Sequence, residues 1–416
     1  MKKRIIGFML CFVLLFSTVT AFASSRLMML EDALSFECLA TSTHDFLVEW
    51  YGLEYAINYQ RSIEYVEQLY SMFPRNRAGD VIYPEFFGGI YLDSYGNLNM
   101  LVTYSDYPLI VPFSRDDGVI TRNVQFSYNQ LSEALDALGE LAFGEYGCFI
   151  LGAVSGFWLS VRNNQVIVDL LDYADKNNEL FKNMALYFPF IVFRQSAGLY
   201  EMPEMPEEYS KVIVESPYQS IEGFSTTVVW AGDRIFLRNA SNNLVLSGTV
   251  GYRAFLGGNP RRYGFITAGH LGINTLGRPL QINQRLYNSS GGYIGSVRAV
   301  RLANVDAAFI EMPSGSVFAG QPHSAAPNIE GNPVMMDRGA SGNLRRGVIT
   351  YRGSANLSLG LVNGFGTSLT STGGDSGSKV FTTSSLVNGI HVAGRPGGTF
   401  FTSVDDHRSF LGSNPR

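Results

Sequence analysis

Cysteine is almost absent from this chain of 416 residues, which contains three. Cys11 lies near the N-terminus, and residues 149–416 contain no cysteine at all. A fold stabilised by several disulfide bonds is therefore excluded, because Cys38 and Cys148 allow one disulfide at most. The sequence leaves open whether these two residues pair. The C-terminal half has to fold on its hydrophobic core alone.

Long hydrophobic runs are also absent after the first 23 residues, so no later segment is expected to span a membrane. Residues 1–23 have a basic start, an apolar run over 5–16 and the small-residue site Ala21-Phe22-Ala23. This pattern is typical of a secretory signal, and we expect cleavage after Ala23. The alternative is an uncleaved N-terminal anchor. The protein is thus expected to be an extracellular bacterial protein without stable membrane association.

Acidic residues are scarce in the second half. Residues 24–222 hold 28 acidic and 11 basic residues, whereas residues 223–416 hold 8 and 17. The net charges, −17 and +9, predict two domains that attract each other. The acidic, proline-containing segment 201–210 is a poor helix or central strand and predicts a linker between them.

Residues 24–222 have mixed α and β patterns. Helical periodicity over 46–73 ends before Pro74, and residues 128–142 predict a second helix. Two similar stretches, 88–103 and 155–170, each predict a strand pair joined by a polar hairpin turn. No cofactor or metal site is visible in this half.

Residues 223–416 change character. Short apolar runs alternate with turns rich in Gly, Ser, Thr and Asn, and no long helical period occurs before residues 404–412. Many short strands separated by turns predict an all-β sandwich or barrel.

One Gly-rich stretch in this half, STGGDSGSKV (371–380), presents a candidate nucleophile, Ser376. A serine hydroxyl needs an imidazole to take its proton, and the imidazole needs a carboxylate to orient it. His270 ends the apolar stretch GFITAGH, and Asp306 begins the apolar stretch DAAFIEM. Taken singly, each residue has an ordinary interpretation. The stretch with Ser376 would be a surface loop, His270 a buried histidine at a strand end, and Asp306 a turn residue.

The ordered set TAGH, DAAFI and GDSGS resembles the chymotrypsin-like serine peptidases over residues 223–412. The resemblance implies an all-β fold of two six-stranded barrels, about 223–320 and 321–412. It implies that His270 is the general base, that Asp306 orients it and that Ser376 attacks the substrate. The N–H groups of Gly374 and Ser376 would form the oxyanion hole. No cofactor and no metal ion are implied.

Two departures from the family pattern are visible. Leu271 stands where many members have a cysteine, and Ser378-Lys379 replace the proline that often follows the nucleophile motif. Neither change removes a catalytic group.

The strand-pair stretches of the first half resemble the propeptides of alpha-lytic-protease-like and streptogrisin-like enzymes. The resemblance implies that residues 24–222 are an inhibitory propeptide that also assists folding. Such help is physically reasonable, because a double barrel is dominated by non-local pairings and folds slowly.

The resemblance also places a substrate pocket near the nucleophile. Thr370 occupies the position that carries Asp in trypsin-like members, so a preference for Lys or Arg is not expected. In the family's glutamyl endopeptidases a histidine in a GIH context and a Ser or Thr bind the substrate, which here correspond to His391 and Ser371. Val392 and Gly394 complete the predicted pocket strand. The alternative is that His391 only packs, over an apolar or aromatic pocket.

Glutamate is unevenly distributed, with 17 residues in 24–222 and two, Glu311 and Glu330, in 223–416. An enzyme that cuts after Glu would destroy the first half and spare itself, and we expect self-processing at Glu222–Gly223. The alternative is that negative charge of both kinds is concentrated in the propeptide and is low in the enzyme. The number of Asp residues also falls between the two segments, but less steeply than the number of Glu residues.

Other functional classes stay open at this stage. One is a catalytically silent, protease-shaped surface binding protein, and another is an adhesin that binds through residues 24–200. For the enzyme we expect protein or peptide substrates, the propeptide as a partner, no nucleic acid and a monomer.

Overall fold

The computed structural model describes residues 43–77, 81–103, 119–144, 146–201, 227–258, 260–319, 324–337, 344–357, 360–383 and 386–415. The predicted signal segment with Ala23 and the predicted processing bond Glu222–Gly223 lie outside these residues, as do the 222/223 domain boundary and most of the predicted linker. Cys38 also lies outside them, and Cys148 is exposed on helix α5 (Gly147–Ala153).

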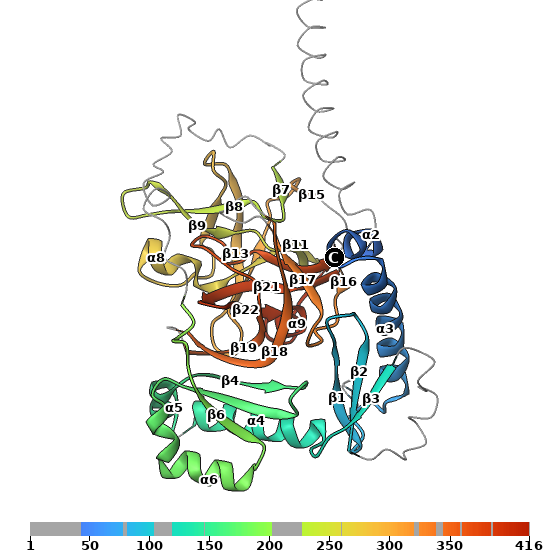
Figure 1. The fold of residues 1–416 in the computed structure, drawn as a ribbon. Helices are drawn as coiled ribbons and strands as arrows, with labels where there is room; N and C mark the ends of the chain where they lie inside the picture. The colour runs from blue at the N-terminus through green and yellow to red at the C-terminus, as the bar shows by residue number, and fades with distance from the viewer. Residues whose placement is uncertain are drawn as a thin grey trace, which may run out of the picture.

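The first unit begins with the helices α2 (Thr43–Tyr51) and α3 (Leu53–Met72). The predicted helix over 46–73 is confirmed, with a break at Gly52, whose φ of 90° is a conformation that glycine adopts without strain. The buried face of α3 packs on a small sheet beside it (Figure 1). Its strands are β1 (Phe87–Leu92), β2 (Leu98–Val102) and β3 (Val119–Asn123).

The second unit repeats this strand arrangement. In the first sheet β1 and β2 form an antiparallel pair and β3 runs parallel to β2. In the second, β4 (Val154–Ser160) and β5 (Gln165–Leu170) form the antiparallel pair and β6 (Ile191–Gln195) runs parallel to β5. Both predicted hairpins are therefore confirmed, and each gains a third strand that the sequence did not indicate.

Helices cover the second unit's sheet. Helix α4 (Tyr128–Phe143) begins with a capping box between Ser127 and Gln130, and its buried face packs against β4 and β5. The chain continues through α5 to a 3₁₀ turn, η3 (Tyr173–Asn177), and to α6 (Glu179–Tyr187).

The first sheet of the β-rich half is antiparallel and eight-stranded. In spatial order its strands are β23 (Ser413–Pro415), β10 (Arg253–Leu256), β11 (Arg262–Thr267), β14 (Ala307–Glu311), β13 (Tyr293–Arg301), β12 (Arg285–Tyr287), β8 (Arg234–Arg238) and β9 (Leu244–Thr249). Beside it, β7 (Val228–Trp230) and β15 (Val317–Ala319) form a short parallel pair. A 3₁₀ turn, η4 (Gly269–Gly272), and the helix α8 (Ile273–Leu276) follow β11.

The second sheet of this half closes into a barrel, because its first and last strands, β17 and β18, pair with each other. In order around the barrel the strands are β17 (Pro333–Met336), β20 (Lys379–Thr383), β21 (Leu386–Arg395), β22 (Gly398–Ser403), β19 (Gly360–Thr367) and β18 (Arg345–Leu357). The short strand β16 (Ser324–Ala325) pairs with β21. The predicted C-terminal helix is α9 (Val404–Leu411), which begins with a capping box at Ser403.

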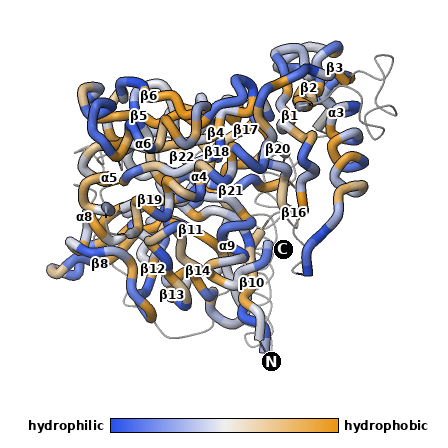
Figure 2. The backbone as a smooth tube through the Cα atoms, turned by 90° about the horizontal axis from the view of Figure 1, so that it is seen from below, coloured by the Kyte–Doolittle hydropathy of each residue, from blue (hydrophilic) through white to orange (hydrophobic). Residues whose placement is uncertain are grey.

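The two halves of the chain share one sheet. Strand β18 pairs with β4, with Gly353 opposite Trp158, and both Figures 1 and 2 show the two strands side by side. Trp158 stacks on Tyr351 at 4.4 Å between ring centroids. Arg395 of the basic half donates to Asp169 of the acidic half at 3.2 Å. The ion pair between Arg395 and Asp169 is therefore a direct contact of the kind that the opposite charges of the two halves predict.

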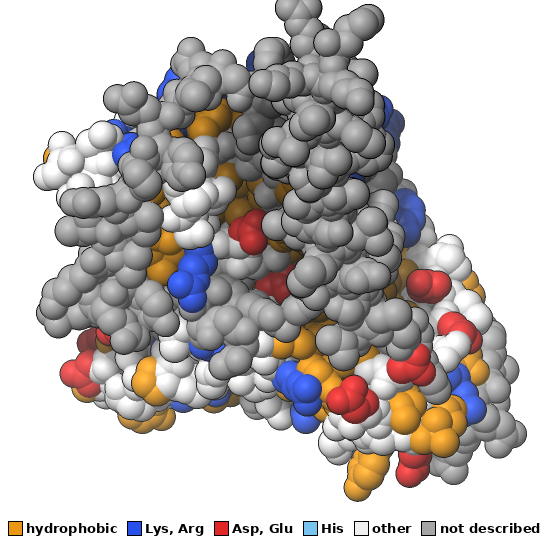
Figure 3. Space-filling view, turned by 90° about the horizontal axis from the view of Figure 1, so that it is seen from above, with side chains coloured by type: hydrophobic (Ala, Val, Ile, Leu, Met, Phe, Trp, Pro, Cys, Tyr) orange, Lys and Arg blue, Asp and Glu red, His pale blue; other side chains and the backbone are white. Residues whose placement is uncertain are grey.

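None of the helices in the described part of the chain is long and apolar enough to cross a membrane. On the face shown in Figure 3, acidic, basic and hydrophobic side chains of the described residues lie intermixed.

Candidate active site

Strand pairing brings His270 and Asp306 together. The buried strand β11 ends at Thr267, and His270 lies three residues later in η4. Asp306 immediately precedes β14, which pairs with β11 so that Thr267 lies opposite Ala308. The end of one strand therefore meets the beginning of the other, and the two motifs become neighbours.

Asp306 is fully buried and uses both carboxylate oxygens. Oδ1 accepts the N–H of Gly269 at 2.9 Å and that of His270 at 3.0 Å, and Oδ2 pairs with Nδ1 of His270. These bonds offset the cost of burying the carboxylate and hold the imidazole with its proton on Nδ1. Nε2 is then the nitrogen that can accept a proton.

The loop that carries Ser376 lies against the end of β11. The carbonyl of Ser376 accepts the N–H of Thr249 at 2.9 Å. Gly377 is so close to the chain before His270 that a Cβ on it would lie 3.1 Å from the amide nitrogen of Ala268. With a φ of 90°, position 377 has a backbone conformation that glycine adopts without strain. Ser376 and His270 thus lie on neighbouring segments that belong to the two different sheets.

The N–H groups of this loop point in two directions. Those of Asp375, Gly377 and Ser378 donate to backbone carbonyls of Thr372, His391 and Asp375 respectively. The N–H groups of Gly374 and Ser376 have no partner among the described residues, and Gly374 has a φ of 90°. They are the two groups predicted to form an oxyanion hole, and their bonding leaves them available for that task.

Arg345, which the sequence did not single out, braces the same loop. Its guanidinium lies 3.0 Å from Oδ2 of Asp375 and donates to the carbonyl of Thr370 at 2.6 Å and to the hydroxyl of Thr372 at 3.1 Å. Asp375 also accepts the N–H of Thr372 at 2.8 Å. Buried charges are normally paired in this way, so the aspartate of the motif has a structural partner.

The predicted pocket residues comprise a contact pair, one exposed residue and two buried residues. A Cβ on Gly394 would lie 2.3 Å from the Oγ of Ser371, so these two residues touch. Thr370 is exposed, and Val392 is fully buried in the hydrophobic core. His391 is completely buried on β21.

His391 has unsatisfied polar atoms. Neither Nδ1 nor Nε2 has a hydrogen-bond partner among the described residues, although both are buried. The pKa of His391 is lowered to about 3, first by burial and then by the nearby His270 and Arg345, whereas the Phe400 backbone acts in the opposite direction. The ring is therefore neutral, with one N–H donor and one acceptor unused among the described residues.

The other buried histidine of this half shows the contrast. His407 accepts or donates through both nitrogens, at 2.7 Å to the hydroxyl of Tyr252 and at 2.8 Å to that of Thr402. Its pKa is also lowered to about 3 by burial. His407 is thus a satisfied core histidine. His323 lies outside the described residues.

A segment of the first half lies on the pocket strand. Glu201 forms an antiparallel bridge with Gly394, with the N–H of each donating to the carbonyl of the other at 2.9 Å. Tyr200, just before it, is buried, and its hydroxyl bonds to that of Tyr351. This contact was not predicted from the sequence, because it joins residues far apart in the chain.

The model of a family described as a Pro-like C-terminal domain matches residues 129–196, which run from α4 to β6. A comparison with curated proteins found no match.

Solved structures similar to the chain are proteases. Thermobifida fusca Protease A is 22% identical to this chain. The match covers 45% of this chain and 98% of that protease, with a TM-score of 0.36. A Nocardiopsis protease is 21% identical, with 46% and 100% covered and a TM-score of 0.37. A glutamic-acid-specific serine protease, described as using a histidine triad in substrate binding, is 24% identical, with 45% and 100% covered and a TM-score of 0.36.

The family match covers part of the first half, and each of these similar structures covers less than half of this chain. The fold class follows from the strand order and register of this chain. An α+β region precedes two β-sheets, which agrees with the predicted fold class. The second sheet closes through six strands as predicted, whereas the first sheet has eight strands instead of six.

Proposed function

We propose that the chain is a secreted serine endopeptidase made as a preproenzyme, which hydrolyses peptide bonds through His270, Asp306 and Ser376. The observation that carries this proposal is the buried pair between Nδ1 of His270 and Asp306, beside the loop of Ser376. A catalytically silent binding protein would not need a buried carboxylate to hold one tautomer of that histidine.

The reaction follows from these groups. Nε2 of His270 takes the proton of the Ser376 hydroxyl as the oxygen attacks the substrate carbonyl, and Asp306 stabilises the imidazolium that forms. The N–H groups of Gly374 and Ser376 would stabilise the oxyanion. The imidazolium then protonates the leaving amine, which gives an acyl-enzyme. Water next attacks the acyl-enzyme while His270 takes its proton, and His270 returns that proton to the Ser376 oxygen as the acid product leaves.

We further propose a preference for Glu before the scissile bond. The unpaired ring of His391 supports it, since leaving a buried polar group unpaired costs about 1–3 kcal/mol and a substrate carboxylate would remove that cost. The Ser371 hydroxyl offers a second donor, and the Arg345 guanidinium supplies positive charge nearby. An apolar substrate side chain would leave the His391 ring unpaired.

Replacement of His391 by alanine tests this preference. The variant should lose Glu selectivity by about 2–5 kcal/mol, because it removes a partner of a buried charge. The measurement is kcat/KM on matched peptides with Glu, Gln, Phe and Leu before the cleaved bond. His407→Ala is the matched control, since His407 is equally buried but fully bonded. An equal loss on all four peptides in His391→Ala would show that this histidine only packs.

Residues 24–222 are proposed to act as an inhibitory propeptide that assists folding. The strand pairing of β4 with β18 and the bridge of Glu201 to Gly394 support both roles, because one completes a protease sheet and the other covers the pocket strand. The proposed signal segment is removed after Ala23, and the proposed maturation cut falls at Glu222–Gly223.

Residues 223–416 expressed alone should therefore refold poorly. The edge of β18 that pairs with β4 is then uncovered, and the non-local pairings of the two sheets form slowly. The measurement is recovery of peptide hydrolysis after dilution from denaturant, with and without residues 24–222 added in trans. Equal recovery in both samples, with no inhibition by the added half, would contradict this role.

A further inference from the structure

Glu330 is a carboxyl group of the protease half that is enclosed by the first half of the chain. It lies between β16 and β17, and its side chain is 11% exposed. Oε2 accepts the N–H of Val161 at 2.8 Å and that of Arg162 at 3.3 Å, both in the turn of the β4–β5 hairpin. Its own carbonyl accepts the N–H of Leu92, at the end of β1, at 2.9 Å. One residue thus contacts both hairpins of the first half.

The chain around Glu330 is shaped for this contact. Gly331 has a φ of 87°, and a Cβ on it would lie 2.1 Å from the carbonyl oxygen of Leu92. A side chain at position 331 would push the β1 hairpin away. The close approach of the two halves therefore depends on glycine next to the buried carboxyl.

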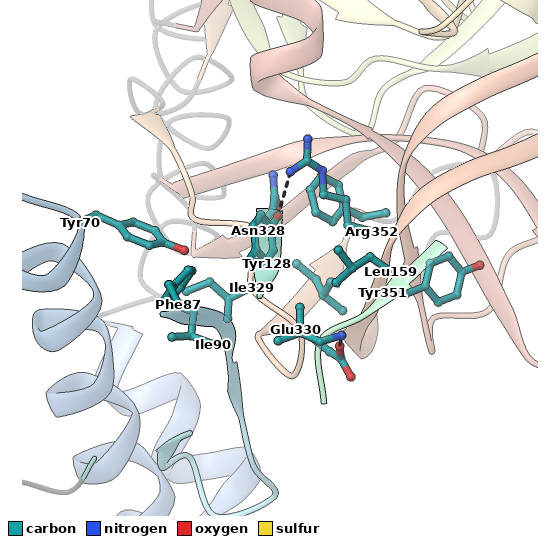
Figure 4. A pocket seen from close by; sticks show the side chains of 13 residues that line it. Tyr70, Phe87, Ile90, Tyr128, Leu159, Asn328, Ile329, Glu330, Tyr351 and Arg352 are labelled. Carbon is teal, nitrogen blue, oxygen red and sulfur yellow. Dashed lines mark hydrogen bonds between the residues drawn. The ribbon is translucent and has the colours of Figure 1, made fainter. Parts of the chain in front are cut away.

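Glu330 lines a small cavity between the halves (Figure 4). The titratable groups that face this cavity are Tyr70 of α3, Tyr128 of α4, and Tyr351 and Arg352 of β18. Arg162 approaches Oε1 at 3.8 Å and lies over the ring of Tyr91 in β1. Glu330 is the only carboxyl among the described residues that line the cavity.

The positive groups are already engaged. Arg352 donates to the hydroxyl of Tyr128 at 3.0 Å, and Nη2 of Arg162 donates to the carbonyl of Leu92 at 3.0 Å. At 3.8 Å, Arg162 is a distant partner for a buried carboxylate. Apart from the two N–H bonds to Oε2, the charge of Glu330 has no close positive partner among the described residues, and burial favours its neutral form.

We propose that Glu330 is a proton-controlled contact, through which acid strengthens and neutral pH weakens the hold of residues 24–222 on the protease domain. The inference rests on the proposed separation of the two halves, but not on the preference for Glu substrates. Its partners Val161, Arg162 and Leu92 all belong to the half that leaves, so separation returns the carboxyl to water.

The sign follows from the two protonation states. Burial raises the pKa of Glu330 to about 7 in the bound state, a net value that already includes the lowering by Arg162 and by the N–H of Val161. The ordinary pKa of this side chain is 4.5. Between these values the bound state holds one proton more than the separated state, so the hold weakens as pH rises and becomes constant above about pH 7. Release thus increases toward the pH at which a histidine base is neutral.

Hydrogen exchange of the full chain tests the proposal, with Ser376→Ala as background so that the chain cannot cut itself. The readout is the protection of the β4 and β18 amides, corrected for intrinsic exchange, between pH 5 and 8. Protection should fall by about tenfold per pH unit between pH 5 and 7, as expected for one proton, and then level off. With Glu330→Gln added, the profile should be flat, because glutamine keeps the acceptor and cannot ionise.

Glu311→Gln is the matched control, because Glu311 pairs with Arg298 within the protease half and should leave the slope unchanged. The same slope in Glu330→Gln as in the parent, or a flat parent profile, would overturn the proposal. If Glu330→Gln does not fold, Arg162→Ala should move the upper limit of the pH dependence to higher pH, and an unmoved limit would overturn it. No catalysis is measured, so the outcome is separate from that of the proposed protease activity.

Discussion

Ser376→Ala is expected to lower peptide hydrolysis by about 10⁶-fold in kcat, the loss seen when the nucleophile of a serine-protease triad is removed. The hydroxyl oxygen forms the acyl-enzyme, and no other group of the loop can replace it. The side chain is small and makes no hydrogen bond that the fold requires among the described residues, so the variant should fold. The measurement is single-substrate kinetics on purified chain with an intact circular dichroism spectrum.

Ser378→Ala is the control for this result. Ser378 lies in the same loop and is fully buried, and its Oγ has no hydrogen-bond partner among the described residues. Its replacement should leave kcat within a few-fold of wild type. Near-normal hydrolysis in Ser376→Ala, or an equal loss in Ser378→Ala, would contradict Ser376 as the nucleophile.

Asp306→Asn should give the second largest loss, about 10⁴-fold in kcat, with little change in the fold. Asparagine keeps an oxygen that can accept the N–H groups of Gly269 and His270. Its amide nitrogen then faces Nδ1 of His270 as a donor, which forces the proton to Nε2. His270 in that tautomer cannot accept the proton of the serine.

Asp233→Asn separates this effect from the mere loss of a buried carboxyl. Asp233 is largely buried, accepts the N–H of Trp230 at 2.8 Å, and its pKa is raised by burial. Its replacement should change stability but leave kcat almost unaltered. Similar losses of kcat in the two variants would show that Asp306 acts through stability and not through His270.

Local signals in the sequence were sufficient for much of the architecture. The helices α3 and α4 follow from their periodicity and from Pro74, and both hairpins follow from their turn residues. The order of three short motifs was enough to nominate His270, Asp306 and Ser376, because each motif combines a strand end with one reactive side chain. The pairing of β11 with β14 explains how they become neighbours.

Contacts between distant segments had no such signal. Strands β3 and β6 were missed because their parallel pairing depends on partners far along the chain. Arg345 and Glu330 were missed for the same reason: each is an ordinary charged residue until the fold places it beside Asp375 or under the β4–β5 turn. His391 was assigned to the predicted pocket only through a family resemblance, and its unpaired nitrogens became visible in three dimensions.

A cleavage-site profile of the secreted protein on a peptide library, together with its own mature N-terminus, tests the central claim most directly. We predict hydrolysis after Glu, a mature chain that begins at Gly223, and no cleavage by the Ser376→Ala chain. Cleavage after aromatic or aliphatic residues, with a mature N-terminus that follows such a residue, would contradict the glutamate pocket. Stable recovery of the full chain without any peptide hydrolysis would contradict the protease itself.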